Sequence, residues 1–323
     1  MRLIALAGLA ALLAGLGRRR RAGQVVRISR VVADLDRSER FYRDGLGFRR
    51  VWEGPLARQV AASLLPGGTA TLRRMRLGAE EIDLVRWDQT GTPYPADSRS
   101  DDRWFQHIAV VCGDLPAAYA RLLAVSPQPI SADGPQVLPG GVAAFKFRDP
   151  DGHPVELIRS PPGQGRAVWQ RSGITLGIDH SALAVGSGTR SLRFYRHLGF
   201  RKTGETFNEG PAQAALDGLE GATARVIGLR LAPSGPGLEL LAYHPPGRAM
   251  PPHRADALLT DWVTLEGRMR RMRLLHDPDG HLLMLAPAPV TAGAAHPRPA
   301  RRRAWTRADA APPRTTAGSG APA

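Results

Sequence analysis

Two histidines and two glutamates occupy matching positions in repeated parts of the chain. His107 and His180 lie near the start of the apolar segments QHIAVVC and DHSALAV, and Glu156 and Glu239 lie in HPVELI and PGLELLAY. Because successive side chains of a strand point to opposite faces, each of the four faces away from its apolar neighbours. A carboxylate between two apolar residues is costly unless it is wet or has a partner. Imidazole and carboxylate groups together are suited to binding a divalent metal ion.

The segments that carry these residues belong to internal repeats. Residues 27–48 (RISRVVADLDRSERFYRDGLGF) and 179–200 (DHSALAVGSGTRSLRFYRHLGF) share an apolar strand, a polar turn, an aromatic-bearing helix and the ending LGF. A weaker copy begins at Gln106. A second element repeats at 148–158 (RDPDGHPVELI) and 276–286 (HDPDGHLLMLA). Such repeats indicate a fold built from similar modules.

The repeated helix and the DPDG hairpin resemble those of the vicinal oxygen chelate superfamily, which includes glyoxalases, extradiol dioxygenases and bleomycin-resistance proteins. The resemblance covers residues 24–287. It implies an α+β fold of tandem βαβββ modules, three full and one truncated, whose curved mixed sheets surround a cavity. Because many chemistries share one fold, the resemblance identifies the architecture better than the reaction.

The repeats divide the chain into four modules. These are residues 24–88, 103–160, 175–245 and the truncated 256–287. We expect the first two modules to form one domain, residues 24–160, and the last two a second domain, residues 175–287. Outside them lie an apolar and arginine-rich segment, residues 1–22, and a tail, residues 288–323, which is predicted to be disordered because it lacks periodicity.

The resemblance also implies a ligand set. In the family, the first strand of a module supplies one metal ligand and its last strand a carboxylate, which here gives His107, Glu156, His180 and Glu239. These four meet only if modules two and three share a sheet. We predict this pairing because it leaves one complete site and one lost site. The implied cofactor is a divalent ion (Zn, Ni, Co, Mn or Fe), with Glu156 or Glu239 as the catalytic base.

The other two modules depart from this pattern. Arg27 occupies the histidine position of module one, where it is no metal ligand because it stays protonated, and Asp83 occupies the carboxylate position. The corresponding residues of module four are expected to be Asp261 and Met284. We therefore expect Arg27 and Asp83 to bind substrate, with Arg27 holding a substrate carboxylate.

Three functions follow from the resemblance. The first is a lyase or isomerase acting on a small molecule with vicinal oxygens, which the metal would polarise as a Lewis acid. The second is an extradiol dioxygenase with Fe(II) bound by two histidines and one carboxylate; if modules one and two shared the pocket, Arg27 would break this triad. The third is a metal-free small-molecule binding protein of the bleomycin-resistance kind. His153 and His281 follow both DPDG turns and are predicted to serve the hairpins instead of a metal.

The net charge of +15 invites a nucleic-acid partner, but its distribution argues against one. Residues 1–22 hold five arginines, and residues 290–323 hold six arginines and one aspartate, so most of the charge lies outside the modules. Residues 3–17 form an apolar run like that of a signal peptide, yet they are too short to span a bilayer and are followed by four arginines. We expect a cytoplasmic protein without stable membrane insertion, with export or membrane association through residues 3–17 as the alternative.

Overall fold

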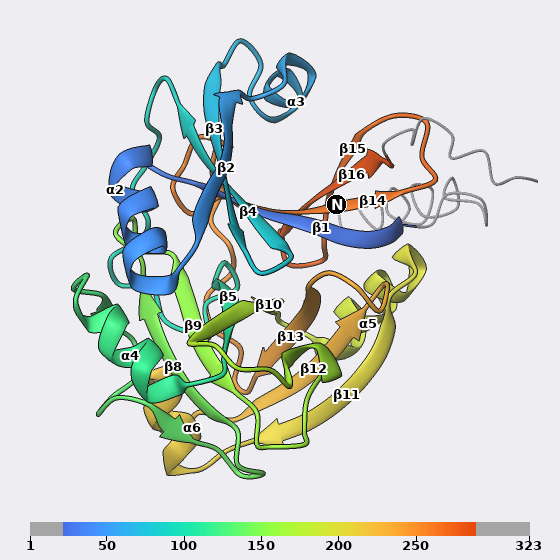
Figure 1. Cartoon of the computed structure of the whole chain (residues 1–323). Helices are drawn as coiled ribbons and strands as arrows, with labels where there is room; N and C mark the ends of the chain where they lie inside the picture. The colour runs from blue at the N-terminus through green and yellow to red at the C-terminus, as the bar shows by residue number, and fades with distance from the viewer. Residues whose placement is uncertain (1–21, 289–323) are drawn as a thin grey trace, which may run out of the picture. The chain divides into compact units, whose positions relative to one another are not determined.

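The computed structural model describes residues 22–288, so the predictions for the N-terminal segment and the C-terminal tail lie outside the described residues. Two mixed sheets dominate this part of the chain (Figure 1). Sheet A has the order β15 (Arg273–His276), β16 (Leu282–Pro287), β14 (Asp261–Gly267), β1 (Ala22–Val31), β4 (Glu80–Trp87), β3 (Ala70–Leu77) and β2 (Arg49–Pro55). Sheet B has the order β11 (Arg201–Asn208), β12 (Ala224–Arg230), β13 (Gly237–Tyr243), β10 (Thr175–Ala184), β5 (Gln106–Cys112), β9 (Pro154–Arg159), β8 (Ala143–Arg148) and β6 (Gln128–Pro129), and β7 (Gln136–Val137) also pairs with β8.

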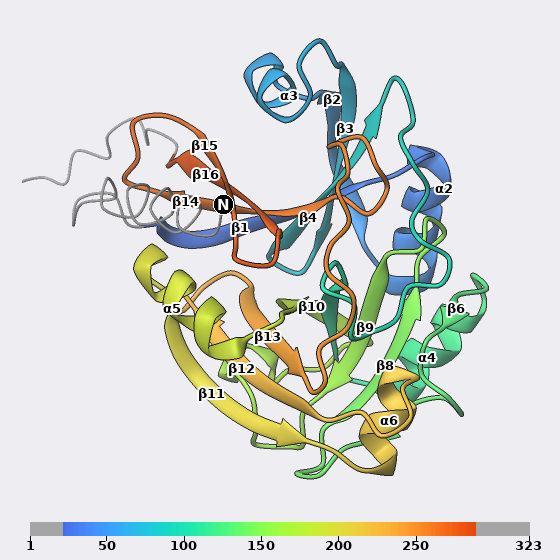
Figure 2. The same cartoon turned by 180° about the vertical axis from the view of Figure 1, so that it is seen from behind.

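The helices are short and lie between the strands of the first three modules. They are α2 (Leu35–Arg40), which continues as the π-helix η1 (Phe41–Gly45), α3 (Arg58–Leu64), α4 (Leu115–Leu123), the 3₁₀ turn η2 (Ala167–Trp169), α5 (Gly188–Leu198) and α6 (Pro211–Asp217). Figure 2 shows α6 beside β8 of sheet B. Within residues 22–288, none of these helices has the length and apolar character that a membrane crossing requires.

The predicted α+β fold of repeated modules is confirmed. Modules one, two and three each carry a helix between their first and later strands, and module four consists of β14, β15 and β16 without a helix. Its loss follows from sequence length, because only five residues separate β14 from β15. The truncated fourth module is therefore present as predicted.

The pairing of modules two and three is also confirmed. β5 and β10, the first strands of these modules, are antiparallel neighbours in sheet B. The first strands of modules one and four, β1 and β14, are antiparallel neighbours in sheet A. Each sheet thus contains one module from the first half of the chain and one from the second half.

The hydrophobic cores connect the modules in a different way. One core joins the aromatic residues of module one, such as Phe41 and Tyr42, to strand residues of module two, such as Phe147. A second core joins Phe194 and Tyr195 of module three to strands of module four. Modules one and two therefore share one core and modules three and four share the other, whereas the sheets join module one with four and module two with three. The domain boundaries at 24–160 and 175–287 stay a prediction.

The helices that cover these cores are set by local signals. α2 begins after Asp34, whose carboxylate accepts hydrogen bonds from two backbone N–H groups of the first turn. α5 begins after Ser187, which caps it in the same way, and ends at Gly199 with φ of 106°. A side chain at this last position would be strained, so glycine fixes the exit of the chain into β11.

Each DPDG hairpin is closed by a buried aspartate. Asp149 accepts hydrogen bonds from two backbone N–H groups of its turn, and Asp277 from three. Their second oxygens accept from Tyr42 (2.8 Å) and Tyr195 (3.1 Å) in the helices of the preceding modules. The hairpins thereby fix the helices of modules one and three.

The histidines of the two DPDG hairpins contact backbone carbonyls in the first strand of another module. The Nε2 atom of His153 lies 2.8 Å from the carbonyl oxygen of Val31 at the end of β1. The Nε2 atom of His281 lies 2.9 Å from the carbonyl oxygen of Ala184 at the end of β10. Both rings are buried, so these bonds satisfy groups that water does not reach.

Candidate metal centre in sheet B

The four predicted metal ligands come together because their strands are neighbours. β9 runs parallel to β5, and β13 runs parallel to β10. The aligned pairs are His107–Ala182, His180–Ala109, Ala109–Glu156 and Ala182–Glu239. The two alanines stand at the centre of this group, and their small side chains leave room for the longer ones around them. The structure therefore brings together residues from four strands of two modules.

The polar atoms of the four side chains are close to one another. The Nε2 atom of His107 lies 3.3 Å from Oε2 of Glu156. The Nε2 atom of His180 lies 4.0 Å from the same oxygen and 3.2 Å from Oε2 of Glu239. Ligand atoms of His107, Glu156 and His180 all lie within 4.8 Å of one another, and these three residues are buried. Glu239 stands at the edge of this trio and is half-buried.

His180 is oriented by a residue that the sequence reasoning missed. The Nδ1 atom of His180 lies 3.1 Å from Oδ2 of Asp179, which also accepts hydrogen bonds from Trp169 and Arg230 through Oδ1. Because a carboxylate only accepts, Nδ1 carries a proton and Nε2 turns toward Glu239 and Glu156.

Strand alternation predicts that Asp179 and His180 point to opposite faces. The pairing of β10 with β5 shifts between Ile178 and His180, which leaves Asp179 in a bulge. A bulge turns a side chain away from its regular direction, and here it allows Asp179 to reach the ring of its neighbour. The only signal in the sequence is that the two residues are adjacent.

A buried lysine is the second residue that was missed. Lys146 of β8 stands opposite Glu156 of β9, and its Nζ atom donates to Asp217 at 2.5 Å. Asp217 also accepts from the hydroxyl of Tyr243. Lys146 is one of two lysines in the chain and lies between two phenylalanines, and this isolation in an apolar strand is a usable signal for a functional or structural cation.

The face that carries the site is partly covered. Phe105, Leu219, Leu241 and Tyr243 pack together with Ala182 and Ala184 on this side of sheet B. The polar group is thus shielded from water on one side, while half-buried Glu239 marks the side nearest to solvent. Such shielding strengthens the electrostatic interactions among the four residues.

Burial controls the charge of His107. It lowers the pKa of this ring to about 4, although Glu156 opposes the effect. The ring is therefore neutral near pH 7, the form that binds metals. Burial raises the pKa of Glu156, but His107, Lys146 and His180 outweigh it and lower this pKa to about 2. Glu156 is therefore ionised.

The second pair behaves differently. Burial lowers the pKa of His180, but Glu239 and Asp179 outweigh it and raise this pKa to about 9. For Glu239, burial raises the pKa above its usual value, with His180 opposing. The site thus contains one carboxylate that stays ionised and one that takes up a proton more readily.

The donor set fits a divalent cation of the zinc type. Imidazole nitrogens and carboxylate oxygens are both ligands of such ions, and the four residues supply two of each. The Nε2 atoms of both histidines, and Nδ1 of His107, are buried without a hydrogen-bond partner among the described residues. Buried polar atoms are rarely left unpaired, and a bound cation would satisfy both Nε2 atoms.

The remaining predicted site residues lie elsewhere. Arg27 and Asp83 are in sheet A, where the Nε atom of Arg27 is 3.4 Å from Oδ2 of Asp83. They do not belong to the group in sheet B. The assignment of Asp261 to the histidine position of module four is wrong, because its carboxylate pairs with buried Arg30 (3.2 Å) and His153 (3.1 Å).

The register of sheet A shows which residue takes that position. Thr264 of β14 is aligned with Met284 of β16, as Ala109 of β5 is aligned with Glu156 of β9. His107 precedes Ala109 by two residues, so its counterpart is Trp262. Met284 is confirmed at the glutamate position, and Asp261 is displaced by one residue.

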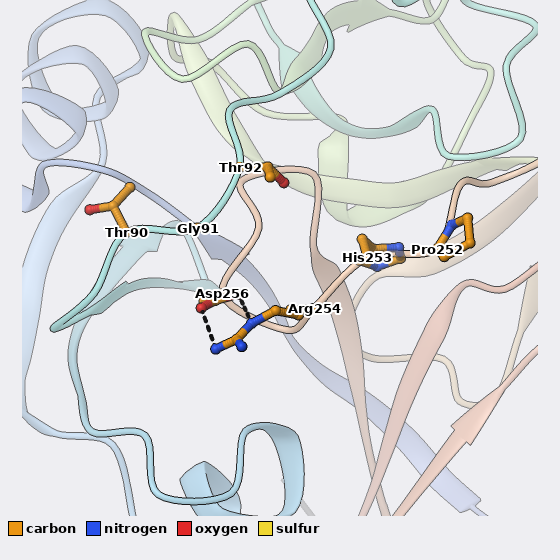
Figure 3. Close-up of a pocket in the computed structure, with 7 residues that line it drawn as sticks. All are labelled: Thr90, Gly91, Thr92, Pro252, His253, Arg254 and Asp256. Carbon is orange, nitrogen blue, oxygen red and sulfur yellow. Dashed lines mark hydrogen bonds and ion pairs between the residues drawn. The ribbon is translucent and has the colours of Figure 1, made fainter.

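A cavity of about 660 Å³ lies away from the metal-ligand candidates, between residues 90–92 and 252–256 (Figure 3). Its charged groups satisfy each other, because Arg254 donates to both oxygens of Asp256 at 3.2 and 3.1 Å. Although this cavity is large, its charged groups are already paired, whereas unpaired polar groups converge in sheet B.

Comparison with known proteins agrees with the repeats. A family model described as the glyoxalase/bleomycin resistance protein/dioxygenase superfamily matches residues 24–157 and 177–304. The structure of glyoxalase I from Zea mays is similar over 81% of this chain and 91% of that chain, with 16% sequence identity and a TM-score of 0.51. A mutant of the same enzyme gives the same coverage, 17% identity and a TM-score of 0.53. At such identities the similarity concerns the fold. No curated protein matches the chain.

Proposed function

Because the chain belongs to the glyoxalase/bleomycin resistance protein/dioxygenase superfamily, we propose that it is a divalent-metal-dependent enzyme of the lyase or isomerase type. Its substrate would be a small molecule with vicinal oxygens. The observation that supports this proposal is the convergence of His107, Glu156 and His180 within 4.8 Å, with Glu239 beside them. When bound, the cation would supply Lewis-acid polarisation of a substrate oxygen.

The two glutamates are proposed to have different roles. Glu156 is buried, its pKa is low, and Lys146 stands opposite it, so it is suited to hold a cation permanently. Glu239 is more exposed and its pKa is raised, because burial disfavours its charge. A carboxylate with a raised pKa at the edge of a site is suited to accept and return a proton during catalysis. We assign this role to Glu239.

Metal content tests the proposal directly. We expect the full chain to bind about one divalent ion after reconstitution and dialysis, and the His107→Ala/His180→Ala variant to bind almost none. The exposed His197→Ala is the matched control and should behave like the wild type. Equal metal content in the wild type and the double variant, measured by elemental analysis, would refute the assignment.

The role of Glu239 needs a separate test. We expect Glu239→Gln to retain bound metal but to lose activity by about 100-fold or more, as for removal of a general base. The exposed Glu220→Gln is the control. Loss of metal together with activity would instead make Glu239 a ligand.

A dioxygenase remains the second function because of one observation. The trio within 4.8 Å consists of two histidines and one carboxylate, His107, His180 and Glu156, which is the set that non-haem Fe(II) oxygenases use. Anaerobic loading with Fe(II), followed by catechol and oxygen, distinguishes the two functions. Oxygen uptake with formation of a yellow product would favour the dioxygenase; its absence in a metal-loaded protein would favour the lyase or isomerase.

A further inference from the structure

Sheet A contains a counterpart of the metal centre in which every ligand has been replaced. The equivalence follows from the strand register, because Ser29 is aligned with Asp83 as Ala182 is with Glu239, and Arg27 with Thr264 as His180 is with Ala109. The replacements are Arg27 for His180, Asp83 for Glu239, Trp262 for His107 and Met284 for Glu156. This set offers a single carboxylate and no imidazole, so it is unsuited to a zinc-type ion.

These four replacements line one cavity of about 440 Å³. Most of its other walls are apolar and include Trp52, Leu72 and Met272. A volume of this size is within the range of about 300–1,000 Å³ that holds small organic ligands. The loss of the metal ligands has therefore left a pocket instead of a filled core.

Two arginines and one carboxylate form the charged part of the cavity lining. Arg27 and Arg74 both line it and share the one carboxylate of Asp83. Arg74 donates to both oxygens of Asp83, at 2.7 and 3.1 Å. Asp83 is therefore already neutralised by Arg74.

Arg27 is the more loosely paired of the two arginines. It lies 3.4 Å from Asp83 and 3.7 Å from Glu266, longer than a normal charge-assisted hydrogen bond. Its side chain is 24% exposed, so its N–H groups are accessible without breaking a tight ion pair. A guanidinium in this state is suited to bind a carboxylate with two parallel hydrogen bonds.

An aromatic wall stands next to these cations. Trp52 is 44% exposed, an unusual state for so large an apolar side chain, and the guanidinium of Arg74 lies 5.9 Å from its ring centre. Buried Trp262 lines the same cavity. An indole face that remains accessible can stack on a flat ligand.

From the cavity, the loosely paired guanidinium of Arg27 and the exposed indole of Trp52, we propose that sheet A holds a second, metal-free binding site for a small aromatic carboxylate. The carboxylate binds Arg27 and the ring packs between Trp52 and the apolar wall. This site is independent of the metal centre in sheet B, because the two groups of residues lie in different sheets.

Calorimetric titration of the full chain with 2-naphthoate tests the proposal, with neutral 2-naphthalenemethanol as the matched ligand. We expect one naphthoate per chain at this site and binding weaker by about tenfold or more for the alcohol, the loss expected for a charge-assisted hydrogen bond. Arg27→Gln and Trp52→Ala should each weaken naphthoate binding by about the same factor, whereas the exposed Arg49→Gln on β2 should leave it unchanged.

The outcomes separate this site from the metal centre. Naphthoate binding that survives His107→Ala/His180→Ala but weakens in Arg27→Gln supports the proposal. Binding that is lost in the histidine variant and kept in the arginine variant overturns it, as does equal affinity for acid and alcohol. The ligand comparison uses only the wild-type protein, so equal affinity for acid and alcohol overturns the proposal even if one of the substituted proteins does not fold.

Discussion

His153 shows how a single buried residue connects two modules through its charge. Its Nε2 atom faces the carbonyl oxygen of Val31, and its Nδ1 atom lies 3.1 Å from Asp261. With an acceptor at each nitrogen, the doubly protonated ring is the best-satisfied form. Burial lowers the pKa of His153, but Asp261 and Asp149 outweigh it and raise this pKa above the usual value.

A stability difference that depends on pH follows from this. Because the folded-state pKa of His153 is above the unfolded-state value of about 6.5, its contribution is fully present below that value and is lost as the pH rises through the folded-state pKa. We expect His153→Gln to lower the free energy of unfolding most in acid and least in alkali. Urea denaturation of both proteins from about pH 5 to about pH 9 checks this. A difference that grows with pH would contradict it.

Asp179 carries the second prediction at this scale. We expect Asp179→Asn to weaken metal binding by about 10- to 100-fold, because carboxylates behind a ligating histidine orient it and raise its basicity. The measurement is a competition titration against a chelator. An unchanged affinity would mean that His180 does not depend on this contact, and Asp44→Asn, at an exposed aspartate on η1, is the control.

The sequence predicted site residues correctly where the strands that carry them are regular. Alternation along a strand was enough to select His107 and Glu156, because both lie where β5 and β9 are regular. It failed for Asp179, because a bulge is set by pairing with β5 and has no local signature here. It also failed for Asp261, since counting between repeats cannot locate a one-residue shift that only the alignment of β14 with β16 reveals.

At the scale of elements, each DPDG hairpin holds its module against the helix of the preceding module through hydrogen bonds. Asp277 accepts hydrogen bonds from three backbone N–H groups and from the hydroxyl of Tyr195. We expect Asp277→Ala to lower the free energy of unfolding by about 3 kcal/mol, because it leaves buried donors unpaired. Chemical denaturation measures this change, and exposed Asp44→Ala should change it by less than about 0.5 kcal/mol. Comparable losses of unfolding free energy in both variants would show that the hydrogen bonds of Asp277 do not stabilise the protein specifically.

The elements themselves were largely predictable, because each repeat carried its own boundaries. The last strand of module one, β4, ends at Trp87, one residue before the predicted boundary at 88, and β16 ends at Pro287, the predicted boundary of module four. The small strands β6 and β7, two residues each, were not foreseen, because such short pairings depend on β8 more than on their own residues.

At the scale of the whole described chain, the modules are connected in a closed cycle. Modules one and four share sheet A, two and three share sheet B, and each consecutive pair at the two ends of the chain shares a core. The segment 160–174 joins the two halves and is mostly exposed. Cutting it breaks the chain but none of the strand pairs β1–β14 and β5–β10.

We therefore expect a protein cleaved at a protease site inserted after Gly163 to stay together. The two fragments should elute as one species in size-exclusion chromatography and separate only on a denaturing gel, because both sheets continue across the cut. Fragments that separate under native conditions would show that the shared sheets contribute little to the association of the halves.

The connecting segment 160–174 also bears on how the pockets in sheets A and B could become different. Two separate half-chains related by a twofold axis would build the same pair of sheets, but every substitution would then occur in both pockets at once. Joining the halves into one polypeptide removes that constraint, since each copy of the gene segment mutates alone. One pocket could keep its imidazoles and carboxylates while the other acquired Arg27 and Trp262. Covalent fusion thus permits a division of labour that a symmetric homodimer does not.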